Sequence, residues 1–339
     1  MDFKGILSFL PDHPRVWLIT GVAGFIGSNL LEALLKLDQS VIGIDNLSTG
    51  KIENIEAVRR VITANQWNNF EFIKGDICDY SLMSDLCKRA DIVLHQAALG
   101  SVPRSLEDPI NSNLSNVTGF LNVLRASQTN NVKRLVYAAS SSTYGDSQIL
   151  PKSEAVIGSP LSPYAVTKLV NELYSDVFSS CFDFHSIGLR YFNVFGPRQD
   201  PFGPYAAVIP RWIEGMIKGD DIFINGDGST SRDFCYIQNV VQANLLAALS
   251  NNICCSRVYN VAVGDSTNLL NLFNLIRVNL RNKGFDYQKN VIFKDWRKGD
   301  VRHSLADISR IKDELLYCPH YDVNRGLGLT VDWFVEKNS

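Results

Sequence analysis

A short apolar strand that runs directly into a glycine-rich turn constrains the fold of this chain most. Val16–Thr20 is a β-rich apolar run typical of a buried strand. Gly21, Gly24 and Gly27 follow it, and the pattern then becomes helical. Gly21 permits a tight turn, Gly24 lets a pyrophosphate approach the helix N-terminus, and Gly27 allows close packing of helix on strand. The stretch is therefore typical of a dinucleotide-binding strand-turn-helix unit.

The next strand indicates which dinucleotide the chain binds. Val41–Ile44 ends at Asp45, about the expected distance beyond the glycines for a carboxylate that accepts hydrogen bonds from an adenosine ribose. A carboxylate there repels a 2′-phosphate, so NAD is favoured over NADP. A plain turn at the strand end is the alternative, because Asp45 is followed by turn-forming residues, namely Asn46, Ser48, Thr49 and Gly50.

Repeated strand and helix patterns predict the fold class. Further apolar strands follow at Phe70–Lys74, Ile92–His95, Arg134–Ala138 and His185–Arg190. Strands that alternate with helices indicate an α/β fold with a Rossmann-type doubly wound parallel sheet. Ligands of such sheets bind at the carboxyl ends of the strands, where the glycine turn and Asp45 both lie.

The chain divides into three parts. Residues 1–15 read as an N-terminal extension with a short helix, and residues 16–195 as the dinucleotide-binding domain. Beyond residue 196 the alternation loosens, and residues 196–339 are expected to form a smaller mixed α/β substrate lobe. A return of the C-terminal part of the chain to the first domain is compatible with this pattern.

Composition excludes several classes of function. A net charge of −2 gives no electrostatic footprint for nucleic acid. No apolar run approaches the roughly 18 residues of a membrane span, and the N-terminus is not a convincing signal peptide. Seven cysteines without a C-x-x-C pair favour reduced thiols in a cytoplasm and no metal site.

Tyr164 and Lys168 form a candidate reaction centre. Ser162 is a suitable N-cap and Pro163 a suitable first helical residue, so Tyr164 and Lys168 lie one turn apart on one helix face. An ammonium beside a phenol favours the phenolate and is expected to lower its pKa toward the working range. Taken alone, the pair is more often an ordinary amphipathic helix.

Together these motifs resemble one protein family. The glycine turn, the serines that begin at Ser140, Tyr164-x-x-x-Lys168 and Tyr191–Asn193 are similar to those of the extended short-chain dehydrogenase/reductases, in particular the nucleotide-sugar epimerases. The resemblance runs from about Val16 to the terminal helix. Within the family the chain looks most similar to UDP-N-acetylglucosamine 4-epimerases, which interconvert UDP-GlcNAc and UDP-GalNAc and often the corresponding uronic acids.

The resemblance implies a mechanism. Tyr164, as phenolate, would take the proton of the sugar 4-hydroxyl while hydride passes from C4 to tightly bound NAD. Return of the hydride to the other face of the 4-keto sugar would invert C4. Lys168 would hold the nicotinamide ribose, and Ser140 would hydrogen-bond the 4-oxygen.

The resemblance also implies the remaining site residues. Those expected at the cofactor are Gly21, Gly24, Phe25, Ile26, Gly27, Asp45, Asn46, Ser48, Thr49, Gly50, Asp76, Ile77, Gln96, Ala97, Ala98, Asn113, Tyr164, Lys168, Tyr191 and Val194. Those expected at the UDP-sugar are Ser101, Ser140, Ser141, Ser142, Tyr164, Asn193, Ala207, Val208, Phe223, Asn225, Arg232, Arg297, Asp300 and Ser304. Asn113 is expected behind Gln96–Ala98, the arginines at the diphosphate, and Phe223 with Asn225 by the uracil.

Three departures from the galactose type favour a 2-acetamido sugar. Ser304 stands where galactose-type epimerases carry a tyrosine, and Ala207 stands where they carry an asparagine. Gly100–Ser101 replaces a lysine beside the sugar. Each change enlarges the pocket or makes it less polar, which leaves room for an N-acetyl group.

Several alternatives stay open. A UDP-uronate 4-epimerase would need a cation or donors for the carboxylate, which Arg104, His303 or the serines could supply. A 4,6-dehydratase would carry an Asp-Glu pair after the catalytic Ser/Thr, whereas this chain has Thr143–Tyr144. An NAD-sensing or scaffold protein would usually lose the tyrosine or the lysine. The family resemblance also implies a homodimer, built from helices at Asn111–Asn130 and Tyr164–Cys181.

Overall fold

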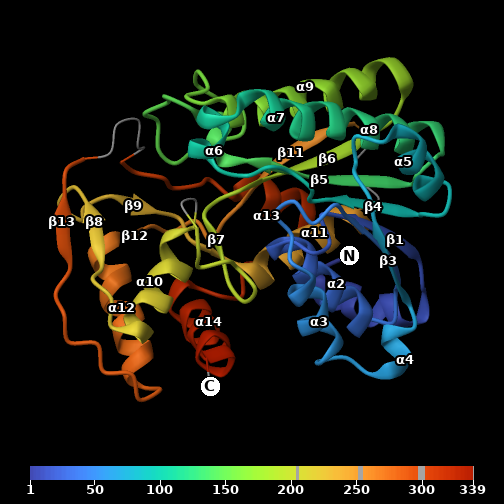
Figure 1. Cartoon of the computed structure of the whole chain (residues 1–339). Helices are drawn as coiled ribbons and strands as arrows, with labels where there is room; N and C mark the ends of the chain where they lie inside the picture. Colours follow the sequence, from blue (N-terminus) through green and yellow to red (C-terminus); the bar gives the residue numbers. More distant parts are fainter. Residues whose placement is uncertain (204–205, 251–254, 297–301, 339) are drawn as a thin grey trace.

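A seven-stranded sheet forms the centre of the larger lobe (Figure 1). The structure is a computed structural model that describes residues 1–203, 206–250, 255–296 and 302–338. All neighbouring strands of the sheet are parallel. Across the sheet they lie in the order β11 (Arg257–Val261), β6 (Ser186–Tyr191), β5 (Arg134–Ser140), β4 (Ile92–His95), β1 (Val16–Thr20), β2 (Ser40–Asp45) and β3 (Phe70–Lys74). The strand order reverses between β1 and β4, as expected of a doubly wound sheet.

Helices cover both faces of the sheet, because successive side chains of each buried strand point to opposite faces. Trp17 and Ile19 of β1 belong to one apolar core, and Leu18 between them belongs to the other. One face carries α2 (Phe25–Lys36), α3 (Ile52–Arg59) and α11 (Ile237–Leu249), and the other carries α5 (Tyr80–Cys87), α8 (Gly119–Thr129) and α9 (Pro163–Phe182) (Figure 1).

The helical segment between β4 and β5 is divided. Pro103 and Pro109 each lie in the first turn of a helix, where a missing backbone N–H costs least. The segment therefore consists of α6 (Val102–Glu107), α7 (Pro109–Asn113), the π-helical turn η2 (Leu114–Thr118) and α8. The predicted helix from Asn111 to Asn130 corresponds to the last three of these.

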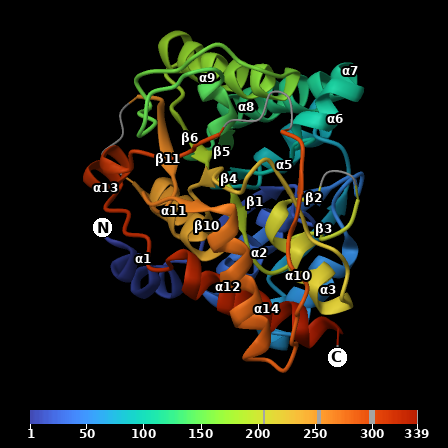
Figure 2. The same cartoon turned by 90° about the vertical axis from the view of Figure 1, so that its left-hand side faces the viewer.

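The smaller lobe is mixed α/β and lies beside the carboxyl ends of the sheet strands (Figure 2). Its helices are α10 (Val208–Lys218), α12 (Leu269–Arg281) and α14 (Val323–Asn338). Its short strand pairs are β8 (Phe223–Asn225) with β13 (Ile292–Lys294), β9 (Ser231–Arg232) with β12 (Thr267–Asn268), and β7 (Val194–Phe195) with β10 (Cys235–Tyr236).

After residue 196 the chain enters the smaller lobe and then returns to the sheet. β11 pairs with β6, and α11 packs against β5 and β6, so residues 237–261 belong to the larger lobe. The remaining short helices are α1 (Phe3–Phe9), η1 (Leu10–Asp12), α4 (Ala64–Trp67), η3 (Ser141–Tyr144) and α13 (Ser309–Leu315). α1 packs on α11. Among the described residues, no helix has the length and apolar content to cross a membrane.

Candidate active site

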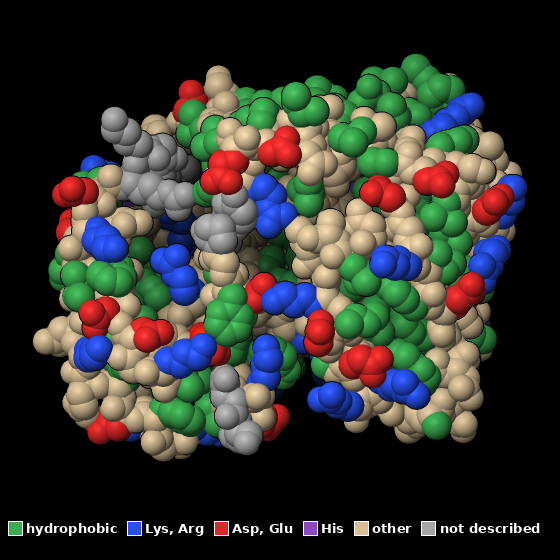
Figure 3. Space-filling view, viewed as in Figure 1, with side chains coloured by type: hydrophobic (Ala, Val, Ile, Leu, Met, Phe, Trp, Pro, Cys, Tyr) green, Lys and Arg blue, Asp and Glu red, His purple; other side chains and the backbone are tan. Residues whose placement is uncertain are grey.

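Two hollows open at the carboxyl ends of the strands, and the molecule is visibly hollowed between its lobes (Figure 3). A narrow cleft of about 80 Å³ is lined by Gly21, Gly24, Ile44, Asp45, Asn46, Ser48, Thr49, Gly50, Gly75, Ile77, Gln96, Ala97, Ala98, Leu99 and Ser115. A larger cavity of about 420 Å³ is lined by Val102, Pro103, Leu106, Ser140, Ser141, Ser142, Tyr144, Gly145, Lys152, Leu161, Ser162, Ala165, Phe192, Asn193, Arg232 and Ser304.

The glycine turn in the narrow cleft has the shape that a dinucleotide needs. Gly21 has φ +71°, and a Cβ there would lie 2.8 Å from the Ala97 backbone. A Cβ on Gly27 would lie 2.1 Å from the Gly21 carbonyl oxygen, so only glycine lets α2 pack this closely. Gly24 caps α2 without a side-chain hydrogen bond. The N–H groups of the first turn of α2, at Phe25 and Ile26, can therefore bind a pyrophosphate.

Asp45 lies in the wall of the same cleft. It is 8% exposed, and its carboxylate accepts hydrogen bonds from the Ala23 N–H at 3.0 Å and the Leu47 N–H at 2.8 Å. Burial raises its pKa, and these two hydrogen bonds partly offset that effect. A carboxylate has about four lone-pair sites, so Asp45 can also accept the hydroxyls of a ribose. The glycine turn and Asp45 thus fit NAD.

The adenine end of the cleft contains most of the residues expected there. Ile77 lines it, and Asn46 Nδ2 donates to Asp76 Oδ2 at 2.8 Å. Asn113, however, is exposed on α7 and does not line the cleft. The buried residue in its place is Asn116, which accepts from the Leu99 N–H at 2.7 Å. The π-helical turn changes which residues face inward.

Ser140 and Tyr164 are brought together by the end of β5 and the start of α9. The Ser140 hydroxyl accepts hydrogen bonds from the Ser142 N–H at 3.1 Å and the Ser142 hydroxyl at 2.9 Å. Its own proton is left to donate to Tyr164, with which it is hydrogen-bonded. Burial raises the pKa of Tyr164, while this hydrogen bond acts in the opposite direction. The lowered pKa expected for Tyr164 is therefore wrong for the protein alone.

Local sequence fixes the start of α9. The Ser162 hydroxyl caps the helix by accepting from the Ala165 N–H at 3.1 Å, and Pro163 is the first helical residue. The Ser105 hydroxyl accepts from the Tyr164 N–H at 3.0 Å, which ties α9 to α6. Both predicted helix-start residues are confirmed, and they hold the Tyr164 backbone from two sides.

Lys168 is buried one turn beyond Tyr164. It is 2% exposed, and its ammonium donates to the Ala138 carbonyl at 2.7 Å. Burial lowers the pKa of Lys168 to about 8, although the Glu172 carboxylate acts to raise it. Burial also lowers the pKa of His95 to about 3, and the Lys168 charge adds to this effect. His95 therefore stays neutral behind the site.

Tyr191 orients Gln96, which lines the narrow cleft. The Tyr191 hydroxyl donates to Gln96 Oε1 at 3.0 Å and accepts from Asn244 Nδ2 at 2.9 Å. Burial raises its pKa, so it remains protonated at neutral pH. Val194 lies nearby in β7, partly buried, and its carbonyl accepts from Gln199. Tyr191 thus acts on the cleft through Gln96.

The larger cavity collects the residues expected at the sugar and its phosphates. Asn193, Arg232 and Ser304 line it together with the three serines. Ser101, at φ +96°, caps α6, which supplies Val102 and Pro103 to the cavity. Ala207 and Val208 begin α10 but do not line the cavity.

Asp233 was not predicted, although it holds this region together. Its carboxylate accepts from the backbone N–H groups of Val263 at 2.9 Å, Gly264 at 3.0 Å and Ala306 at 3.3 Å. Burial raises the pKa of Asp233 to about 6. The Arg232 segment is thereby joined to the segment that carries Ser304. In the sequence, the only sign of this role is that Asp233 directly follows an arginine expected at the substrate.

The residues expected at the uracil lie on β8 and do not line the cavity. Phe223 is 38% exposed, and the Lys294 ammonium lies 3.7 Å from the centre of its ring. Asn225 is exposed on the same strand. Arg297 and Asp300 lie outside the described residues. Sequence reasoning missed Lys294, because its position depends on the pairing of β13 with β8.

Comparison with known proteins gives one consistent family. The sequence profile of the NAD dependent epimerase/dehydratase family matches residues 17–262. The structure superposes with TM-score 0.87 on the UDP-N-acetylglucosamine 4-epimerase of Methanobrevibacter ruminantium in complex with UDP-N-acetylmuramic acid; the two are 39% identical, over 96% of this chain and 99% of that one.

Two further relatives are named as epimerases of other UDP-sugars. The UDP-glucose 4-epimerase of Thermotoga maritima, solved with UDP-glucose, is 34% identical with TM-score 0.86, over 96% of this chain and 100% of that one. A UDP-glucuronate 4-epimerase of Thermodesulfobacterium geofontis is 32% identical over 95% of this chain and 96% of its own length. The relatives therefore share 4-epimerisation of UDP-sugars and differ in the sugar.

Proposed function

The chain belongs to the NAD dependent epimerase/dehydratase family, and we propose that it is a 4-epimerase of UDP-N-acetylhexosamines that interconverts UDP-GlcNAc and UDP-GalNAc. The observation that carries the proposal is the hydrogen bond between Tyr164 and Ser140, because Ser140 lines the cavity that Arg232 and Ser304 also line. Lys168 lies one helical turn beyond Tyr164, and a separate cleft fits NAD.

The proposed chemistry assigns a proton to Tyr164. NAD, when bound, accepts a hydride from C4 of the sugar and returns it, and the charge of its oxidised nicotinamide favours the phenolate. Tyr164 takes the proton of the 4-hydroxyl and later gives it back. Ser140 donates to the same oxygen and keeps the 4-keto sugar in place. Because the hydride returns to the opposite face, C4 is inverted with no net oxidation.

Lys168 and Asp45 are assigned to the cofactor. The Lys168 ammonium has three donors, of which one is used by Ala138, and it can hold the nicotinamide ribose. Its positive charge also favours a phenolate at Tyr164. Asp45 is assigned to the adenosine ribose, where its charge opposes a 2′-phosphate.

The Asp45 assignment predicts loss of cofactor. Asp45→Asn puts an NH₂ group where the carboxylate now accepts from Ala23 and Leu47, so one of these donors faces another donor. We expect at least about tenfold weaker NAD binding and about 1–3 kcal/mol lower stability. NAD released from the denatured protein and thermal unfolding measure the two effects. Asp85→Asn, at an exposed ion pair with Lys88, is the matched control. Unchanged NAD content would contradict the assignment.

Preference for the N-acetyl sugar rests on the small residue at position 304. Ser304 lies in the wall of the cavity, and its N–H donates to the Ser231 carbonyl at 3.1 Å. This bond fixes the backbone, so a larger side chain at 304 would occupy the cavity.

Ser304→Tyr is the test of this preference. The ring is expected to lower kcat/KM for UDP-GlcNAc by about 10–100-fold through overpacking and to affect UDP-glucose less, because glucose lacks the acetamido group. Rates on the two sugars, measured side by side, give the ratio. Ser266→Tyr, on an exposed loop of the same lobe, controls for the added ring. Equal activity of wild type and Ser304→Tyr on UDP-GlcNAc would contradict the proposed preference for the N-acetyl sugar.

A 4,6-dehydratase is the second enzyme class considered. Elimination of water requires a group that removes the C5 proton. The described residues that line the cavity include no Asp or Glu, and Thr143 is buried with its hydroxyl donating to the Ser140 carbonyl. These observations favour epimerisation over elimination.

A homodimer stays a prediction. Apolar side chains gather on the outer side of the helices that cover one face of the sheet (Figure 3). Ile110 of α7 is 81% exposed, and Leu173 and Val177 of α9 are more than half exposed, at 57% and 51%. Exposed apolar residues on two adjacent helices fit burial against a second copy of the chain.

A further inference from the structure

The sugar cavity contains a second cation that the proposed function does not use. Arg232 and Lys152 both line the cavity, and the described residues of its wall include no Asp or Glu. Arg232 is assigned to the diphosphate. Lys152 is 4% exposed, and lysine is rarely buried to this extent without an anionic partner. A cavity with two cations and no carboxylate in its described wall suits a ligand with a second anionic group.

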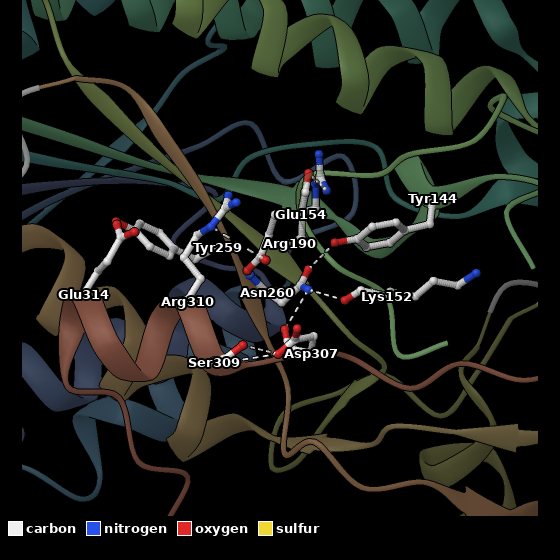
Figure 4. Close-up of polar contacts among 10 residues, drawn as sticks. All are labelled: Tyr144, Lys152, Glu154, Arg190, Tyr259, Asn260, Asp307, Ser309, Arg310 and Glu314. Atoms are coloured by element: carbon white, nitrogen blue, oxygen red, sulfur yellow. Dashed lines mark hydrogen bonds and ion pairs between the residues drawn. The ribbon is translucent and has the colours of Figure 1, made fainter. Parts of the chain in front are cut away.

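The backbone of Lys152 is fixed by its neighbours (Figure 4). Its N–H donates to the Leu305 carbonyl at 2.7 Å, and its carbonyl accepts from the Asp307 N–H at 2.9 Å. The same carbonyl accepts from Asn260 Nδ2 at 2.8 Å, and Asn260 Oδ1 accepts from the Tyr144 hydroxyl at 2.6 Å. Lys152 is thus held between the segment after the serines and the segment after Ser304.

The ammonium of Lys152 points away from this network (Figure 4). Its hydrogen-bond acceptor is the Ser147 carbonyl, and no ion pair to it is found among the described residues. Glu154, two residues along, is engaged elsewhere: Oε1 accepts from the Asn260 N–H at 2.9 Å and Oε2 lies 3.9 Å from Arg310. Two of the three ammonium donors are therefore left for a ligand in the cavity.

We propose that the Lys152 ammonium forms a subsite for a carboxylate on the hexose ring. The inference rests on the proposed function, which places the sugar 4-oxygen at Ser140 and Tyr164. Lys152 lines the same cavity as Ser140, which is assigned to the 4-oxygen, and Arg232, which is assigned to the diphosphate. The substituents next to C4 are carried on C3 and on C5, so the anionic group is a C6 carboxylate or an acidic ether on O3.

The test compares neutral and acidic sugars. kcat/KM is measured for UDP-GlcNAc and for its uronic acid, UDP-GlcNAcA, and UDP-N-acetylmuramic acid is tested as an inhibitor of UDP-GlcNAc turnover. In Lys152→Met we expect an at least tenfold larger loss for the acidic ligand than for UDP-GlcNAc, carried by KM or the inhibition constant. A loss confined to UDP-GlcNAcA assigns the C6 carboxylate, and a loss confined to UDP-N-acetylmuramic acid assigns the O3 ether.

Two further variants separate recognition from structure. Lys152→Arg keeps the cation and should retain most of the preference for the acidic ligand, whereas Lys289→Met removes an exposed, ion-paired lysine and should not alter it. Equal losses on neutral and acidic ligands in Lys152→Met would overturn the proposal. If Lys152→Met does not fold, binding to the wild-type protein tests the proposal. Weaker binding of both acidic ligands than of UDP-GlcNAc would then overturn the proposal. If the wild-type protein does not turn over UDP-GlcNAc, the proposed function is rejected instead. Binding of the acidic ligands would still test the role of Lys152.

Discussion

Tyr164→Phe is expected to lower kcat for UDP-GlcNAc epimerisation by about 10³-fold, because it removes the group that exchanges the 4-hydroxyl proton. The ring stays, so packing at the start of α9 changes little, and the protein should retain NAD. The initial rate of UDP-GalNAc formation measures the loss, and bound NAD and thermal unfolding show that the site is otherwise intact.

Tyr174→Phe is the matched control for this variant. Tyr174 lies on the same helix, ten residues beyond Tyr164, and is partly buried. It should keep wild-type activity. A Tyr164→Phe protein that holds NAD and epimerises at more than about a tenth of the wild-type rate would remove Tyr164 from the proton transfer.

Lys168→Met is the second large effect. The methionine fills the buried volume but cannot hold a ribose or favour the phenolate, so we expect about a 10²-fold loss of kcat/KM and weaker NAD binding. Since burial lowers the Lys168 pKa to about 8, the ammonium is present below that pH and lost above it. The part of wild-type kcat/KM that depends on this charge should fall as pH rises through about 8, and this fall should be missing in the variant.

Lys88→Met controls for loss of a lysine. Lys88 is exposed and ion-paired with Asp85, so its variant should keep both the wild-type rate and the wild-type pH profile. If Lys168→Met showed the same fall in kcat/KM near pH 8 as the wild type, another group would have to be responsible for it.

The sheet could be predicted from the sequence because its central strands are buried and its strands form short apolar runs. Val16–Thr20, Phe70–Lys74 and Ile92–His95 are strands with the bounds that their apolar runs predict. Each site motif follows a strand end, so parallel pairing alone brings the glycine turn, Asp45 and Ser140 to one edge. The start of α9, where the candidate reaction centre lies, could be predicted as well, because a serine cap and a first-turn proline act through local interactions.

Other parts of the site depend on tertiary structure. A π-helical turn decides that Asn116, and not Asn113, faces Leu99, and regular helical periodicity does not anticipate it. Lys152 lies in a loop without periodicity and reaches the cavity only because Leu305 and Asp307 pair with it. The pKa of Tyr164 was also misjudged, because the sequence shows the neighbouring Lys168 but not the depth of burial.

The measurement that tests the central claim most directly is an NMR assay in D₂O without added NAD. The purified protein is incubated with UDP-GlcNAc, and the anomeric and H4 signals of the sugar are followed. We predict that UDP-GalNAc accumulates with protium retained at C4, since the hydrogen leaves and returns within the site. Protein that holds NAD but forms no UDP-GalNAc would favour a sensor or scaffold, and deuterium at C4 would contradict the proposed mechanism.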